Sequence, residues 1–298
     1  MKVIDSFVVL CDYCEKERFR GWDPYDGLNS RLFQFLPFFK KSAVCRLVLI
    51  QGFKRSPINL RRMALVPKEY NAKGIGLFLS GYCNLYKAVV EFPRLAERVG
   101  TAGMIKTRIE ELAELLISLR SEGYRGACWG YNFDWQARRL FLFPKNTPTV
   151  VATNFCATAL MDAYEVTKNE GYLKCALSAA DFVLEDLHRA EYNGGFLFSY
   201  SPLKGNDTVF NASLLGSRLL SYCYYYTGKE EYKTAARASV IVEKTPFCAC
   251  FWVAMDFTTL ATISLTILSS MRCDLPFFFD SFRFYSSFSE RILIRLSL

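Results

Sequence analysis

The chain has 298 residues, of which 51% are apolar and 16% aromatic, a composition typical of a globular protein with a large core. Its formal net charge of +8 favours anionic partners. No basic run carries a recognised nucleic-acid-binding motif, so the sequence does not indicate a nucleic acid partner.

The cysteine pattern and the N-terminus predict a cytoplasmic protein. The eleven cysteines are scattered, and they lack the paired spacing of small secreted domains. The apolar run at 7–11 is too short for a signal peptide and is flanked by Asp5 and Asp12. The uncharged run at 257–271 is shorter than the roughly 20 apolar residues of a bilayer span, so we expect no stable membrane insertion.

Apolar periodicity predicts a series of helices in the first half of the chain. The expected helices are 2–18, 31–51 (with a bend or restart at Pro37), 72–89 and 104–120. Between the first two, the segment 21–30 is expected to be a loop because of its Gly, Pro, Asn and Asp content. The segment 52–71 is basic and contains proline.

An internal repeat predicts the architecture. Residues of one unit recur 60 positions later in the next: Leu160, Tyr164, Thr167, Tyr172 and Ala176 are followed by Leu220, Tyr224, Thr227, Tyr232 and Ala236. Each unit reads as a helix, a short polar turn and a second helix, whose apolar faces need neighbouring hairpins. A long loop at 192–200 between the units favours an α/α toroid over a 34-residue helical repeat. In such a ring the long loops gather at one end and form a cleft.

The repeat pattern stops near Lys244. The segment 246–298 has no Gly, Lys, Asn, Gln or His, but it has nine Phe and eight Ser. We therefore predict an all-α, incomplete α/α-toroid domain at 1–245 and an atypical tail at 246–298. Two explanations of the tail stay open: a non-native ending, such as a frameshifted reading of a longer gene, or a divergent terminal segment.

The loop at 21–30 is the first candidate site. Flat aromatic faces can cover the C–H surfaces of sugars, and carboxylates can accept hydrogen bonds from sugar hydroxyl groups. Asp-Pro and Asp-Gly are also ordinary turn formers, and Asn is an ordinary helix cap, so a structural role stays open. The candidate residues are Trp22, Asp23, Tyr25, Asp26 and Asn29.

A second candidate site lies between helices at 129–136, where aromatic residues surround a single carboxylate, Asp134. Burial near apolar rings would raise the pKa of Asp134, as a general acid requires. A helix cap or a buried structural aspartate is the equal alternative. The candidate residues are Trp129, Tyr131, Asp134 and Trp135.

The basic segment at 54–62 is a candidate for binding an anionic group. Arg55 and Arg61 could fork onto the carboxylate of a uronic acid or the phosphate of a phosphorylated sugar. The alternative is a solvated basic loop, which is what most charge runs are.

The sequence offers few of the residues that several other chemistries require. His188 is the only histidine, which disfavours a Ser-His-Asp or Cys-His mechanism. Cys11 and Cys14 have zinc spacing but lack a second pair, and no Gly-rich phosphate-binding motif occurs. We therefore expect no cofactor and no metal. Catalysis would fall to carboxylates, with Asp134 or Asp23 as the general acid or base and Asp26 as its partner.

Five stretches carry a family resemblance: 22–30 (WDPYDGLNS), 54–60 (KRSPINL), 67–74 (PKEYNAKG), 129–136 (WGYNFDWQ) and 147–153 (TPTVVAT). Over residues 1 to about 245 the chain resembles six-hairpin glycosidase-like proteins, and more narrowly a bacterial group encoded near surface-polysaccharide biosynthesis genes. Some members of that group carry a delta-aminolevulinic acid dehydratase label. Such a dehydratase is a β/α barrel with a Schiff-base lysine, which an all-helical chain does not support.

The resemblance implies a carbohydrate-active or carbohydrate-binding protein in surface-polysaccharide biosynthesis or modification. Its partner would be an oligosaccharide or polysaccharide, including anionic ones, and an enzymatic version would be glycoside hydrolase-like or another sugar-modifying enzyme. The alternatives are a non-catalytic helical interaction scaffold and an inactive truncated product. The scaffold alternative predicts no concave cleft of aromatic and acidic side chains. No feature of the sequence predicts the oligomeric state.

Overall fold

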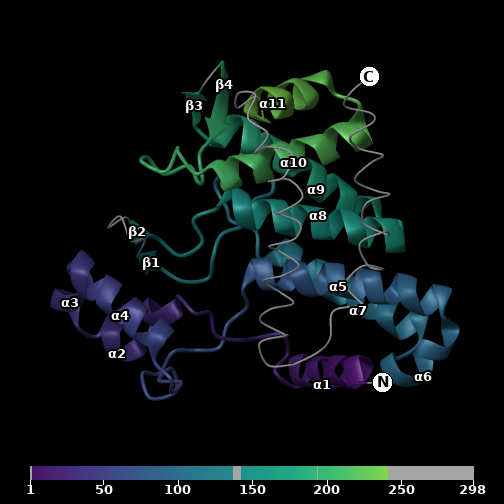
Figure 1. Ribbon diagram of the computed structural model, residues 1–298, viewed down its shortest axis with the longest axis horizontal. Coiled ribbons are helices and arrows are strands. Elements are labelled where there is room, and N and C mark those ends of the chain that lie inside the picture. The colour runs from purple at the N-terminus through teal and green to yellow at the C-terminus, as the bar shows by residue number, and fades with distance from the viewer. Residues whose placement is uncertain (1, 137–141, 193, 241–298) are drawn as a thin grey trace.

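The computed structural model describes residues 2–136, 142–192 and 194–240. Helices dominate this part of the chain, which confirms the all-α class (Figure 1). The longer helices are α1 (Lys2–Lys16), α4 (Ala43–Arg55), α5 (Ala72–Glu91), α7 (Ala102–Ser118), α8 (Val150–Thr167), α9 (Glu170–Asp181), α10 (Phe210–Thr227) and α11 (Glu230–Val240). Short helical segments are η1 (Asp26–Asn29), α2 (Arg31–Gln34), α3 (Pro37–Lys41), η2 (Pro93–Leu95), α6 (Ala96–Val99) and η3 (Phe182–Asp186).

Two short antiparallel strand pairs accompany the helices. They are β1 (Trp135–Gln136) with β2 (Leu142–Phe143), and β3 (Arg189–Tyr192) with β4 (Gly195–Phe198). The second pair occupies most of the segment 192–200 that the sequence predicted to be a loop. The prediction was wrong there because the four residues of β4 pair with the four residues of β3, and composition alone does not indicate this pairing.

Three helical hairpins form two layers. Helices α5, α8 and α10 lie side by side in one row, and α7, α9 and α11 pack against them as the second row (Figure 1). One hydrophobic core of mostly aliphatic side chains runs through all six helices, including Leu79, Leu160 and Leu219. This arrangement confirms the predicted hairpin architecture. The helices of the first row all run in the same direction, parallel to one another.

The 60-residue repeat is confirmed helix by helix. Helices α8 and α10 are both 18 residues long, and α9 and α11 begin 60 residues apart. Both turns use a left-handed residue after the first helix, Lys168 with φ 61° and Gly228 with φ 68°. Such a residue ends a helix by turning the chain back so that its backbone N–H caps the last turn.

Side-chain caps decide where several helices begin. Ser42, Asn71, Thr101 and Thr149 each accept a hydrogen bond from a backbone N–H in the first turn that follows. The helix predicted at 31–51 is divided into α2, α3 and α4 because Pro37 opens a new helix and Ser42 caps another. The remaining predicted helices are observed with ends shifted by about two residues, the usual error of such boundaries.

Helices α2, α3 and α4 form a layer apart from the hairpins (Figure 1). A small core of Leu28, Phe33 and Ile50 holds them together and contacts Trp135 and Leu142 of the β1–β2 pair. The predicted tail at 246–298 and the run at 257–271 lie outside the described residues. None of the helices in the described ranges is long and apolar enough to cross a lipid bilayer.

The loop after α7 approaches α9 at Gly126. A Cβ atom at this position would lie 2.1 Å from the carbonyl oxygen of Ser178, and φ is +101°. We expect Gly126→Ala to lower the free energy of unfolding by about 3 kcal/mol, since overpacking adds to left-handed strain. Urea denaturation of the variant measures this loss.

Gly123 in the same loop provides the matched control. Its φ is also positive, +87°, but a Cβ atom there would have no neighbour within 4 Å. Gly123→Ala should therefore cost only about 1 kcal/mol, the strain alone. Equal losses for the two variants would contradict the close approach of this loop to α9.

Candidate functional site

A cleft of about 1200 Å³ lies at the start of α5. Its walls come from segments that are far apart in the sequence. They are the end of α1 with the loop at 17–25, the segment 51–61, the start of α5 with the residues before it, the segment 131–136 and Tyr200. The long connections thus meet at one end of the helical layers and enclose the cleft.

Asp23 is the central carboxylate of the cleft. Its Oδ2 accepts a hydrogen bond of 3.1 Å from Nδ2 of Asn71, and its Oδ1 accepts one of 2.9 Å from the backbone N–H of Tyr25. Burial raises the pKa of Asp23 above its ordinary value, and the negative charge of Asp26 adds to the rise. The carboxyl group can therefore hold a proton at higher pH than an exposed aspartate can.

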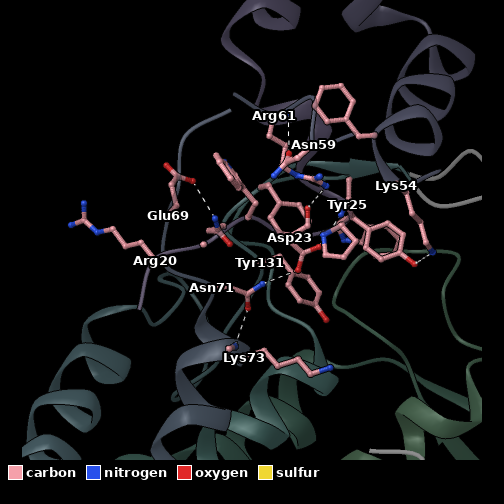
Figure 2. A pocket seen from close by; sticks show the side chains of 18 of the residues that line it. Arg20, Asp23, Tyr25, Lys54, Asn59, Arg61, Glu69, Asn71, Lys73 and Tyr131 are labelled. Atoms are coloured by element: carbon pink, nitrogen blue, oxygen red, sulfur yellow. Dashed lines mark hydrogen bonds between the residues drawn. The ribbon is translucent and has the colours of Figure 1, made fainter. Parts of the chain in front are cut away.

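Asn71 links this carboxylate to the helix that carries the next basic group. Its side chain caps α5 by accepting from the backbone N–H of Gly74, and it donates to Asp23 (Figure 2). Lys73 follows in the first turn and lines the cleft. Burial lowers the pKa of Lys73, and the neighbouring Asp23 carboxylate partly opposes that change.

Two tyrosines complete the floor of the cleft. Tyr131 donates a hydrogen bond to the hydroxyl group of Tyr200, and burial raises the pKa of both phenols. Both side chains line the cleft, and Tyr131 lies beside Asp23 and above Lys73 in Figure 2. The site thus offers hydroxyl, carboxyl and amine groups within one concave surface.

Aromatic rings form the sides of the cleft. Trp22, Tyr25 and Trp135 all line it. Trp22 is held by a hydrogen bond of 2.9 Å from Nε1 to the carbonyl oxygen of Val66. Trp135 stacks on Phe143, with ring centroids 4.4 Å apart and planes 3° apart. These contacts fix the rings in place, as a preformed stacking surface requires.

Asp26 and Arg61 form an ion pair instead of the separate roles expected of them. Nε of Arg61 lies 2.8 Å from Oδ1 of Asp26, and the side chains are only 12% and 4% exposed. Arg61 also donates a hydrogen bond of 2.8 Å to the backbone oxygen of Asp23. Arg61 reaches the cleft, but its guanidinium is committed to this pair, and Asp26 does not line the cleft.

Other sequence candidates lie away from the cleft surface. Trp129 is 0% exposed and donates from Nε1 to the backbone oxygen of Leu116, so the expected stacking role for this ring is wrong. Asp134 accepts a hydrogen bond of 2.6 Å from the backbone N–H of Lys145 and is not part of the lining. Arg55 is exposed and also lies outside the lining.

Asn29 acts behind the cleft wall. Its Nδ2 donates to Oε2 of Glu69 at 3.3 Å and to the backbone oxygen of Asn132 at 3.2 Å. Glu69 itself lines the cleft, and Asn132 and Lys145 contact the same carboxylate. Asn29 therefore positions a second acidic group without reaching the cleft itself.

The sequence reasoning missed Glu69, Asn71 and Lys73 as site residues. The stretch 67–74 was part of the family resemblance, yet no pattern within it distinguishes a site residue from a helix start. The two-residue bridge between Gly21 and Glu69 brings the stretch beside Asp23. That pairing joins residues 48 positions apart and has no local sequence signal.

Comparisons with known proteins add little to this description. No protein-family model matches the chain, and no curated protein matches it. A solved structure of D-mannose isomerase is similar over 73% of this chain, with 14% sequence identity and a TM-score of 0.40. The chain spans 58% of that protein's length. A likeness of this size assigns no activity, and the architecture rests on the packing of the chain's own helices.

Proposed function

We propose that this protein binds a glycan in the cleft and modifies it, with Asp23 as the acid–base group. The observation that carries the proposal is the half-buried carboxyl group of Asp23 in a cleft that is also lined by aromatic rings. Trp22, Tyr25 and Trp135 supply apolar faces for the C–H surfaces of sugar rings. The raised pKa of Asp23 suits a group that donates a proton to a leaving oxygen and takes it back.

Glu69 is the second carboxylate of the proposed mechanism. It replaces Asp26 in this role because Asp26 is paired with Arg61 and lies outside the lining. Side-chain amides of Asn29 and Asn132 hold Glu69 at one edge of the cleft. In this position it can accept hydrogen bonds from sugar hydroxyl groups or activate a water molecule.

Basic side chains in the lining support an anionic glycan. Arg20, Lys54 and Lys73 all line the cleft; in Figure 2 Lys54 lies beside Tyr25 and Lys73 below Asp23, whereas the Arg20 side chain points away from them. They take the role that the sequence assigned to Arg55 and Arg61. A carboxylate or phosphate on the sugar would be complementary to them. The resemblance to a group encoded near surface-polysaccharide genes supports a surface polysaccharide, or a precursor of one, as the glycan.

The Asp23→Asn variant tests the acid–base assignment. A glycan array of uronic-acid-containing and phosphorylated oligosaccharides identifies a ligand, and mass spectrometry follows its conversion. We expect Asp23→Asn to retain binding within about tenfold and to lower turnover at least about 100-fold, the usual contribution of a general acid or base. Wild-type turnover that needs the protonated form should fall as pH rises through the raised pKa of Asp23.

Glu170→Gln is the control for this experiment, since Glu170 starts α9 and is exposed outside the glycan cleft. It should leave binding and turnover unchanged. Turnover that survives Asp23→Asn in full would show that Asp23 is not the acid–base group. If the wild type bound a glycan but did not convert it, the protein would be a glycan-binding protein and the catalytic part of the proposal would be wrong.

A further inference from the structure

The positive charge of the chain is concentrated in one segment. Residues 27–68 contain nine Lys and Arg residues and no Asp or Glu. The whole chain carries a net charge of +8, so this segment accounts for all of the excess. It comprises α2, α3, α4 and the residues that follow them, which form the separate layer in Figure 1. Such a concentration attracts an anionic surface.

The same layer exposes large apolar side chains. Helix α3 buries none of its residues, and Phe35 and Phe38 are each 81% exposed. Leu36 and Phe39 beside them are also exposed. Four neighbouring apolar side chains in water are unfavourable by the hydrophobic effect, and a contiguous patch of this kind marks an interaction surface.

Helix α4 extends this patch. Its Ile50 and Phe53 are buried, whereas Val44 and Val48 are exposed one turn apart on the opposite side. Beyond α4, further exposed apolar residues continue the surface along the segment: Ile58, Met63 and Leu65. We refer to the exposed residues of 31–65 as the basic-apolar surface.

Free cations are interleaved with these apolar residues. Lys40 and Lys41 directly follow the two phenylalanines of α3, and Arg62 precedes Met63. Within the described ranges, five basic side chains of this surface form no ion pair: Arg31, Lys40, Lys41, Arg55 and Arg62. No acidic side chain of the described ranges neutralises these charges.

We propose that the basic-apolar surface docks the protein on an anionic phospholipid bilayer. Phe35 and Phe38 would enter the interface between headgroups and acyl chains, while Lys40 and Lys41 contact lipid phosphates. A bilayer supplies negative charge and an apolar layer in the same plane, which matches both features of the surface. A second copy of the chain would bring the same five unpaired cations against this surface and be repelled.

The cleft opens beside this surface. The segment 51–61 belongs to both, since Lys54, Ile58 and Asn59 line the cleft. Docking would therefore hold the mouth of the cleft close to the lipid headgroups, where membrane-anchored glycans are exposed. The docking itself does not depend on the proposed function of the cleft.

Vesicle flotation of the full chain tests the docking surface. We expect binding to phosphatidylglycerol vesicles and little binding to phosphatidylcholine vesicles. Lys40→Gln with Lys41→Gln should weaken binding about 30-fold, because each cation near an anionic surface contributes about 1 kcal/mol. Phe35→Ser with Phe38→Ser should weaken it at least about tenfold through lost apolar burial.

Matched controls distinguish docking through this surface from non-specific hydrophobic adsorption. Val90→Ser with Phe92→Ser removes exposed apolar side chains at the far end of α5, and it should bind as the wild type does. Melting curves confirm that all variants fold. Asp23→Asn should also float normally, so that failure of the glycan proposal would not affect this result.

Three results would overturn the proposal. They are absence of binding to phosphatidylglycerol vesicles, equal binding to both lipids, and full binding by the Phe35→Ser, Phe38→Ser variant. Sedimentation velocity of the same proteins identifies the rival occupant. A dimer that this variant dissociates, together with no vesicle binding, would assign the surface to a second copy of the chain.

Discussion

Replacing Trp129 by alanine is expected to lower the free energy of unfolding by about 4 kcal/mol. The ring is 0% exposed within the main core, and its Nε1 donates a hydrogen bond of 2.8 Å to the backbone oxygen of Leu116. Truncation leaves a large cavity and removes the indole hydrogen bond to Leu116, whose carbonyl oxygen still accepts from the backbone N–H of Leu119. Urea denaturation followed by circular dichroism measures the loss.

Trp135→Ala is the matched comparison because the two tryptophans lie six residues apart in one motif. Trp135 lines the cleft and is only partly buried, stacked on Phe143. Its truncation should cost about 1.5 kcal/mol, from a lost ring contact and partial burial, and should weaken glycan binding. Similar stability losses for the two variants would contradict the division of the motif into a core ring and a cleft ring.

Replacing Arg61 by alanine is expected to be as costly, about 4 kcal/mol. The change leaves the Asp26 carboxylate, whose side chain is 4% exposed, without its cation. It also removes the hydrogen bond to the backbone oxygen of Asp23, which helps to hold the loop at 21–30. Thermal and urea unfolding at neutral pH measure the effect.

Arg55→Ala is the control, since Arg55 is exposed and forms no ion pair with another described residue. It should change stability by no more than about 0.5 kcal/mol. A different outcome for Arg61→Ala would support the role in binding an anionic group that the sequence suggested for Arg61. If Arg61→Ala left stability intact and only weakened glycan binding, the guanidinium would be a ligand-binding group.

The helical hairpins were determined by the sequence alone. Apolar spacing along 160–180 and 220–240, with the polar turns between, specifies two helices and a turn in each unit, because this pattern is local in the sequence. Capping residues such as Asn71 and Thr149 act within one turn of helix, so they too are visible in the sequence. The candidate loop at 21–30 was likewise recognisable from its content of Asp, Trp and Tyr.

Which of those side chains face the cleft was decided only by the tertiary structure. Trp129 and Trp135 have the same chemistry and the same motif, and packing against α7 and α8 buries one while the β1–β2 pair presents the other. Glu69 lies in the site because its backbone forms a β-bridge with Gly21. Burial and pairing depend on chain segments distant in the sequence, and a local pattern contains no information about them.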